Sequence, residues 1–212
     1  MLKELSDHWS QLEGSVHPAD KSKFELYPDH GFNLDYPPPA FIGDVVNAPI
    51  VILSNNGGYS ETGTPKEFPD RDALDEYRDM LSNPRPLSRN ERTVARYYLE
   101  RNYTQWLVDG VATLVNGVAY RSVDGKAKHV TRMTKTLPSA LVHQTWLRQV
   151  LLPQAERGER FVIVHRWSRW NGAAEVFRAC PNSVFSSAPI GENLTTLEFE
   201  AGRSFLARRD FA

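Results

Sequence analysis

Hydrophobic and polar positions alternate in blocks along the chain, and two blocks, 49–54 and 160–167, are short apolar runs that predict buried strands. Residues 110–120 have strand-like composition, and residues 182–189 predict a further strand that ends in a turn. After the first run, Leu74, Tyr77 and Leu81 recur at helical spacing, and Ser139 can cap a further helix. Strands that alternate with helices favour a parallel sheet. We therefore expect a three-layer α/β/α fold with a short, mainly parallel central sheet.

Two other segments bear on how the chain is organised. Ser88-Arg-Asn-Glu91 is a capping box, which predicts a helix with Tyr97 and Tyr98 on its inner side. Residues 195–202 fit either a late strand or the start of a helix. With 212 residues and 41% hydrophobic content, the chain can bury one substantial core. We expect a single domain over 1–212, with the polar residues 1–35 as an N-terminal extension packed on it.

The net charge of the chain bears on whether it binds nucleic acid. The chain has 25 basic and 26 acidic residues, a formal net charge of −1, so no global field attracts nucleic acid. Arginines nevertheless crowd the last third of the sequence, at Arg148, Arg157, Arg160, Arg166, Arg169 and Arg178. Such a cluster is either a local basic patch or, more commonly, a solvated face.

Several kinds of chemistry lack their sequence signals. The single cysteine, Cys180, excludes an internal disulfide framework, and six histidines without HExxH spacing predict no metal site. The phosphate-loop, dinucleotide-binding and nucleophile-elbow patterns are also missing, so we expect no cofactor. No apolar run approaches the ~20 residues that span a bilayer. The start lacks the apolar core of a signal peptide. We expect a soluble, cytoplasmic monomer without a membrane partner.

Polar and small residues follow each predicted strand, at the places where ligands bind in open α/β sheets. They are Asn55, Asn56, Gly57, Gly58 and Tyr59, then Asn116 and Gly117, then His165, Arg166 and Trp167, and finally Ser186 to Pro189. Together they predict a pocket for a flat, hydrogen-bonding ligand. The Gly-Gly pair can also be a simple tight turn, and His165 is more often a satisfied core histidine than a catalytic one.

The stretch YPPPAFIGDVVNAPIVILSNNGGYSETGTPKEF, residues 36–68, resembles the first signature of the uracil-DNA glycosylase superfamily. In that family a Pro-rich lead and a Gly-Asp turn precede an apolar strand and an Asn-Pro-Gly type loop. The single-strand-selective monofunctional branch is the most similar, since its loop continues through Thr-Gly-x-Pro to a phenylalanine. Later segments agree in order, because LVNGVAYRS resembles the strand with the base-reading asparagine and VFSSAPIGENL stands at the last motif.

The resemblance implies an enzyme that hydrolyses the N-glycosidic bond of uracil or another deaminated base in DNA. It assigns Asn55 to positioning the attacking water, within a loop that includes Asn56, Gly57 and Gly58. Phe68 would stack on the base, Tyr59 would pack beside it, and Asn116 would read its Watson–Crick edge. Ile190 would be the wedge that enters the DNA. Leu194 is the other candidate, though a core position suits it better.

Two departures from the family pattern keep other functions open. Ser186 stands where the family has a histidine that donates to the leaving base, and Asn-Asn-Gly-Gly replaces the Asn-Pro-Gly turn. A non-catalytic module that binds a nucleobase, a nucleotide or single-stranded nucleic acid is one alternative. A small-nucleoside hydrolase is another. In each case the partner is DNA or a ligand with a nucleobase. Individually, Phe68 and Tyr59 can close the core, and the asparagines can serve turns.

Overall fold

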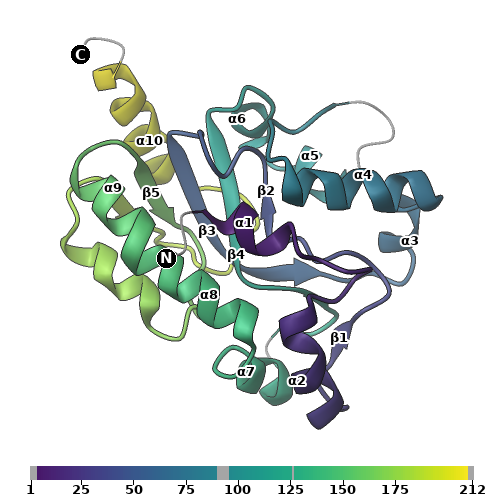
Figure 1. Cartoon of the computed structure of the whole chain (residues 1–212). Helices are drawn as coiled ribbons and strands as arrows, with labels where there is room; N and C mark the ends of the chain where they lie inside the picture. Colours follow the sequence, from purple (N-terminus) through teal and green to yellow (C-terminus); the bar gives the residue numbers. More distant parts are fainter. Residues whose placement is uncertain (1–3, 90–95, 126, 210–212) are drawn as a thin grey trace.

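Six strands form one sheet in the part of the chain that the computed structural model describes, residues 4–89, 96–125 and 127–209 (Figure 1). The strands are β1 (Phe32–Asn33), β2 (Phe41–Ile42), β3 (Ile50–Gly58), β4 (Ala112–Ser122), β5 (Phe161–Val164) and β6 (Ser183–Phe185). Their order is β1-β4-β3-β5-β6, and β2 also pairs with β4.

The sheet is mainly parallel. β3 pairs in parallel with β4 and β5, and β5 with β6, whereas β1 and β2 run antiparallel to β4. Along the chain, β4 lies on one side of β3, and the next strand, β5, lies on the other side. The strand order therefore reverses between β3 and β5. In open sheets, ligands bind at this reversal, beyond the carboxyl ends of the strands.

Helical segments connect the strands. The α-helices are α1 (Leu5–Trp9), α2 (Lys21–Leu26), α3 (Thr64–Glu67), α4 (Arg71–Ser82), α5 (Arg96–Leu99), α6 (Thr104–Val108), α7 (Lys128–Met133), α8 (Pro138–Trp146), α9 (Leu152–Glu156) and α10 (Thr196–Arg209). Short 3₁₀ helices occupy Pro18–Asp20 and Ala173–Ala179, and a π-helical turn, Leu147–Leu151, joins α8 to α9.

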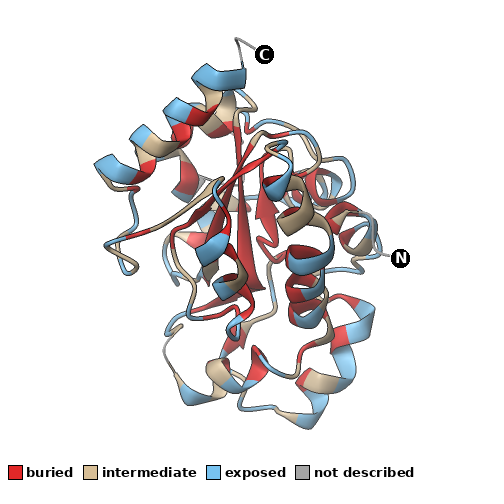
Figure 2. Cartoon of the chain, turned by 90° about the vertical axis from the view of Figure 1, so that its left-hand side faces the viewer, coloured by how far each residue is buried: buried red, intermediate tan, exposed pale blue. Residues whose placement is uncertain are grey.

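Helices cover both faces of the sheet, so the buried strands lie at the centre (Figure 2). α6 and α10 share one face, where a Cβ atom on Gly202 would lie 2.8 Å from Trp106 and 3.2 Å from Ile50. α8 packs on β4, and α1 contacts α8 through a hydrogen bond from Trp9 to His143. The expected α/β fold with helices around a mainly parallel sheet is confirmed.

The N-terminal segment is joined to this body by buried polar contacts as well as by apolar packing. The Tyr120 hydroxyl of β4 donates to Asp20 and accepts from the backbone N–H of His17. The other oxygen of Asp20 accepts from the backbone N–H of Ser139, at the start of α8. Residues 4–35 thus share the core of the single body that the structure describes.

Tertiary pairing changes three of the predicted elements. β3 continues past residue 54 to Gly58, because β4 also continues and pairs with it across a bulge between Asn56 and Gly58. For the same reason Asn116 lies inside β4, opposite Ser54, and not near its end. Residues 196–202 belong to helix α10. The capping box at 88–91 extends into 90–95, outside the described residues.

Among the described residues, no helix combines the length and the apolar character that a membrane crossing requires.

Candidate functional site

A cavity of about 660 Å³ lies at the carboxyl ends of β3 and β5, where the strand order reverses. Asn55 and Asn56 of β3 and Asn116 of β4 line it. The turn after β5 and the loop around Ile190 provide further parts of the wall. A volume of this size suits a small organic ligand. The structure therefore brings together three of the sequence-predicted polar residues around one space.

Asn116 lines the cavity, and its amide oxygen is an acceptor without a hydrogen-bond partner among the described residues. Its amide nitrogen donates to the carbonyl of Pro39 at 2.6 Å and lies 3.5 Å from the hydroxyl of Tyr98. Its oxygen Oδ1 is buried and has no partner among the described residues, and the residue is 1% exposed. An unpaired buried acceptor costs about 1–3 kcal/mol. The Pro39 bond fixes which atom is the nitrogen, so the oxygen is the group of the Asn116 amide that can still accept a hydrogen bond.

Two consecutive hydrogen bonds, from Trp9 to His143 and from His143 to Asn116, hold the backbone of Asn116 in place. The indole N–H of Trp9 donates to Nε2 of His143 at 2.8 Å, so Nδ1 of that ring carries the proton. Nδ1 then donates to the backbone carbonyl of Asn116 at 2.7 Å. Burial lowers the pKa of His143 to about 4, although the bond to Asn116 opposes the shift. The neutral imidazole is therefore a structural support for the strand at pH 7.

The asparagines of β3 differ in what they can offer. Oδ1 of Asn55 accepts from the backbone N–H of Arg169 at 3.2 Å, which leaves the amide N–H₂ as the group that can bind a ligand or water. In contrast, Nδ2 of Asn56 donates to the carbonyl of Gly57 and to the Ser122 hydroxyl. Asn56 therefore stabilises the bulge between the strands, and Asn55 is the better candidate for contact with a ligand.

Of the remaining predicted loop and stacking residues, only Gly58 lines the cavity. A Cβ at Gly58 would meet open space, whereas a Cβ at Gly57 would lie 2.3 Å from Cγ of Pro39. Tyr59 lines a second cavity of about 500 Å³. Phe68 is 7% exposed and stacks on Tyr36 with ring centroids 5.2 Å apart. Phe68 lines neither of these two cavities, so the predicted base-stacking position is not found there.

Ser186 is buried, whereas Ile190 is exposed to solvent. The Ser186 hydroxyl accepts from the backbone N–H of Ala188 at 3.1 Å, and the residue is buried beside the cavity without lining it. The donor predicted at 186 therefore belongs to a turn. Ile190 is 82% exposed at the rim of the cavity, whereas Leu194 is buried. Of the two wedge candidates, only Ile190 is placed to meet a macromolecule.

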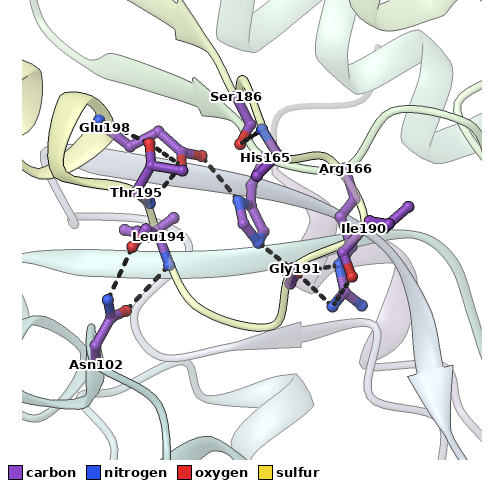
Figure 3. A network of polar contacts seen from close by, with 10 residues as sticks. Asn102, His165, Arg166, Ser186, Ile190, Gly191, Leu194, Thr195 and Glu198 are labelled. Carbon is purple, nitrogen blue, oxygen red and sulfur yellow. Dashed lines mark hydrogen bonds and ion pairs between the residues drawn. The ribbon is translucent and has the colours of Figure 1, made fainter.

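His165 lines the cavity and is held between two acceptors (Figure 3). Nδ1 lies 2.8 Å from Oε1 of Glu198, and Nε2 lies 2.9 Å from the carbonyl of Gly191. A carboxylate and a carbonyl can only accept hydrogen bonds, so each ring nitrogen of His165 faces an acceptor. Burial alone raises the pKa of Glu198, but hydrogen bonds from His165 and Thr195 outweigh it and hold that pKa below its usual value.

The same network fastens the loop that carries Ile190. The carbonyl of Gly191 also accepts from the guanidinium of Arg166, whose Nε lies 2.8 Å away. On the other side, Asn102 exchanges two hydrogen bonds with the backbone of Leu194, at 2.8 and 3.0 Å. Figure 3 shows the loop between these two attachments. Ile190 is thus an exposed apolar side chain on a loop held at defined points.

The arginines of the last third do not converge on one face. Arg148, Arg157 and Arg178 are exposed, and the buried Arg160 donates to the carbonyls of Val45 and Val46. Arg166 and Arg169, which follow β5, both line the cavity.

Sequence reasoning missed three aromatic residues of the wall, Tyr97, Tyr98 and Tyr103. Trp167, which was predicted at the rim, also lines the cavity. Burial raises the pKa of Tyr98 to about 12, so its phenol is neutral. The capping-box helix indicated that Tyr97 and Tyr98 face inward, but nothing local indicated that they face this cavity. Tyr97 is partly exposed and holds the Arg101 guanidinium over its ring at 3.9 Å.

No family model, curated protein or solved structure matches this chain. Among the described residues, no group of three or more His, Cys, Asp or Glu side chains is placed to hold a metal ion.

Proposed function

We propose that this chain is a divergent DNA glycosylase of the uracil-DNA glycosylase type, which binds a deaminated base in the cavity and hydrolyses its N-glycosidic bond. The observation that carries the proposal is the buried, unpaired Oδ1 of Asn116. This atom needs a donor from the ligand. Deamination of cytosine or adenine converts a ring nitrogen on the Watson–Crick edge from an acceptor into an N–H donor. The acceptor at Asn116 therefore favours uracil and hypoxanthine over the parent bases at that ring position.

The wall of the cavity supports the other requirements of the reaction. Negative charge grows on the departing base, and Arg166, a cation from the end of β5, lies on the wall where it can stabilise that charge. In this proposal Arg166 takes the place of the donor expected at Ser186. Asn55 can fix a water through its free amide N–H₂, but an amide does not accept the water proton. We therefore expect slow hydrolysis.

Access to DNA is consistent with the same geometry. A base in a duplex must leave the stack, at a cost of a few kcal/mol, before it enters a pocket. Ile190 is an apolar side chain exposed at the rim, where it can fill the gap that the base leaves. Single-stranded DNA avoids the unpairing cost, so we propose that it is the preferred substrate.

A non-catalytic module that binds a nucleobase or nucleotide is the second candidate. It is favoured by the position of Ser186 outside the cavity and by the engagement of Oδ1 of Asn55 with the backbone of Arg169. Binding of the base through Asn116 would be the same in this case, and only the chemical step would be missing.

Base excision from a defined oligonucleotide tests the proposal. Labelled single strands with one deoxyuridine, deoxyinosine or deoxycytidine at the test position are incubated with the protein and treated with alkali. We expect cleavage at deoxyuridine, none at deoxycytidine, and losses of about tenfold or more for Asn116→Ala and Asn55→Ala. Asn83→Ala is the matched control, since Asn83 is exposed at the end of α4 and bonds only to nearby residues.

The outcome separates the candidates. No cleavage of any deaminated base at excess protein, together with binding of deoxyuridine that Asn116→Ala abolishes, replaces the glycosylase with the binding module. Turnover of free deoxyuridine that exceeds excision from DNA indicates a small-nucleoside hydrolase.

A further inference from the structure

Two arginines lie in the cavity wall and can bind a part of the ligand other than its base. Arg166 is half-buried, and Arg169 is only 7% exposed. Both belong to the turn that follows β5, and both line the cavity together with Asn116. A guanidinium group can bind carboxylate or phosphate oxygens through pairs of parallel N–H bonds.

Neither guanidinium is neutralised by a carboxylate within ion-pair distance in the described residues. Arg169 donates to the hydroxyl of Thr131 at 3.0 Å, and Arg166 donates to backbone carbonyls of the neighbouring loop. The buried Arg121 provides a contrast, because it pairs with Glu67 at 3.1 Å. Burial lowers the pKa of Arg169, and Asp124 only partly offsets this effect. A buried cation without a paired anion is unfavourable, so an anionic ligand that enters the cavity is stabilised.

The backbone around Arg169 is fixed before any ligand binds. Its N–H donates to Asn55, and the next residue, Trp170, donates from its indole to the carbonyl of Ser54 at 2.8 Å. The strand β4 packs closely on the turn, since a Cβ at Gly117 would lie 3.0 Å from the carbonyl oxygen of Arg169. Because the turn is rigid, little conformational entropy is lost when the guanidinium contacts an anion.

We propose that Arg166 and Arg169 form a phosphate-binding site in the wall of the cavity, so that the ligand is a nucleotide unit and not a free base or nucleoside. The phosphate is the monoester of a free nucleotide or the diester of a DNA strand. The nucleotide identity rests on the proposed function, whereas anion binding by the two arginines does not.

Equilibrium binding to the full chain tests this site, with the fluorescence of Trp167 and the other tryptophans as the signal. The probes are deoxyuridine, deoxyuridine 5′-monophosphate, inorganic phosphate and a single strand with one deoxyuridine. We expect the monophosphate to bind about tenfold or more tightly than deoxyuridine. Arg169→Gln removes this difference and changes the affinity for deoxyuridine less than about twofold, and Arg169→Lys restores part of it. Arg178→Gln, an exposed arginine paired with Glu175, leaves all affinities unchanged.

Equal affinities of the wild type for deoxyuridine and its monophosphate overturn the proposal without any variant. It is also overturned if Arg169→Gln and Arg166→Gln both fold and weaken the two probes equally. If only the monophosphate is affected by Arg169→Gln, the site serves free nucleotides, and if the strand is also affected, it serves DNA. Tighter binding of the monophosphate without base excision supports the phosphate-binding site and refutes the glycosylase. Base excision without tighter binding of the monophosphate supports the glycosylase and refutes the phosphate-binding site.

Discussion

The ion pair between His165 and Glu198 leads to the sharpest prediction on stability. Both side chains are almost completely buried, and their charged atoms are 2.8 Å apart. Glu198 accepts three hydrogen bonds, one from His165 and two from the backbone N–H and hydroxyl of Thr195. Glu198→Gln preserves the shape of the side chain but replaces one acceptor oxygen by an N–H₂ donor. Either Nδ1 of His165 or the backbone N–H and hydroxyl of Thr195 then face the new N–H₂ group.

We expect Glu198→Gln to lower the free energy of unfolding by about 3–5 kcal/mol, the usual cost of removing one partner of a buried pair. Urea denaturation measures this value, and an unchanged dependence on urea would show that the native and unfolded states remain comparable. The control is Glu175→Gln, which breaks the exposed pair with Arg178 and should cost at most about 1 kcal/mol. Equal losses in the two variants would refute a stabilising role for the buried contact between His165 and Glu198.

The pH dependence of the same variant supplies a second test. The pKa of Glu198 is lower in the folded than in the unfolded protein, so its contribution to stability is complete above the unfolded pKa of about 4.3. This contribution is lost as the pH falls through the folded pKa. The difference in stability between wild type and Glu198→Gln should therefore shrink below about pH 4.3. A difference that is constant from neutral to acidic pH would exclude an ionised Glu198.

Two further predictions concern the support of the cavity. Burial lowers the pKa of His143 to about 4, so the unfolded chain binds the proton at a higher pH than the folded protein. The free energy of unfolding due to this group should therefore fall as the pH decreases from about 6.5 to about 4. Chemical denaturation should show a smaller fall in His143→Gln, and an identical fall would contradict a buried neutral ring. Gly57→Ala should lower the free energy of unfolding by about 1–3 kcal/mol, because the new methyl group would meet Pro39. In Gly58→Ala the methyl group meets open space, so this variant should unfold at nearly the wild-type temperature. Similar melting temperatures for the two variants would show that the loop adjusts freely.

Local sequence pattern was sufficient for the α/β class and for part of the rim. The apolar runs at 49–54 and 160–167 lie in the buried strands β3 and β5, as expected for strands covered on both faces. Asn55, Asn116 and His165 line one cavity as expected, although Asn55 and Asn116 lie inside β3 and β4 and not at their ends.

Contacts distant in sequence decided the rest. Glu198 is 33 positions from His165, in a segment compatible with either a strand or a helix, and only the packing of α10 brings the two together. The Ser186 hydroxyl turned to the Ala188 backbone instead of the cavity, and Phe68 was covered by Tyr36. Periodicity reports which residues are buried, because burial follows element geometry. It does not report which buried polar atoms meet, and this is why the free oxygen of Asn116 and the unpaired Arg169 emerge only from the tertiary structure.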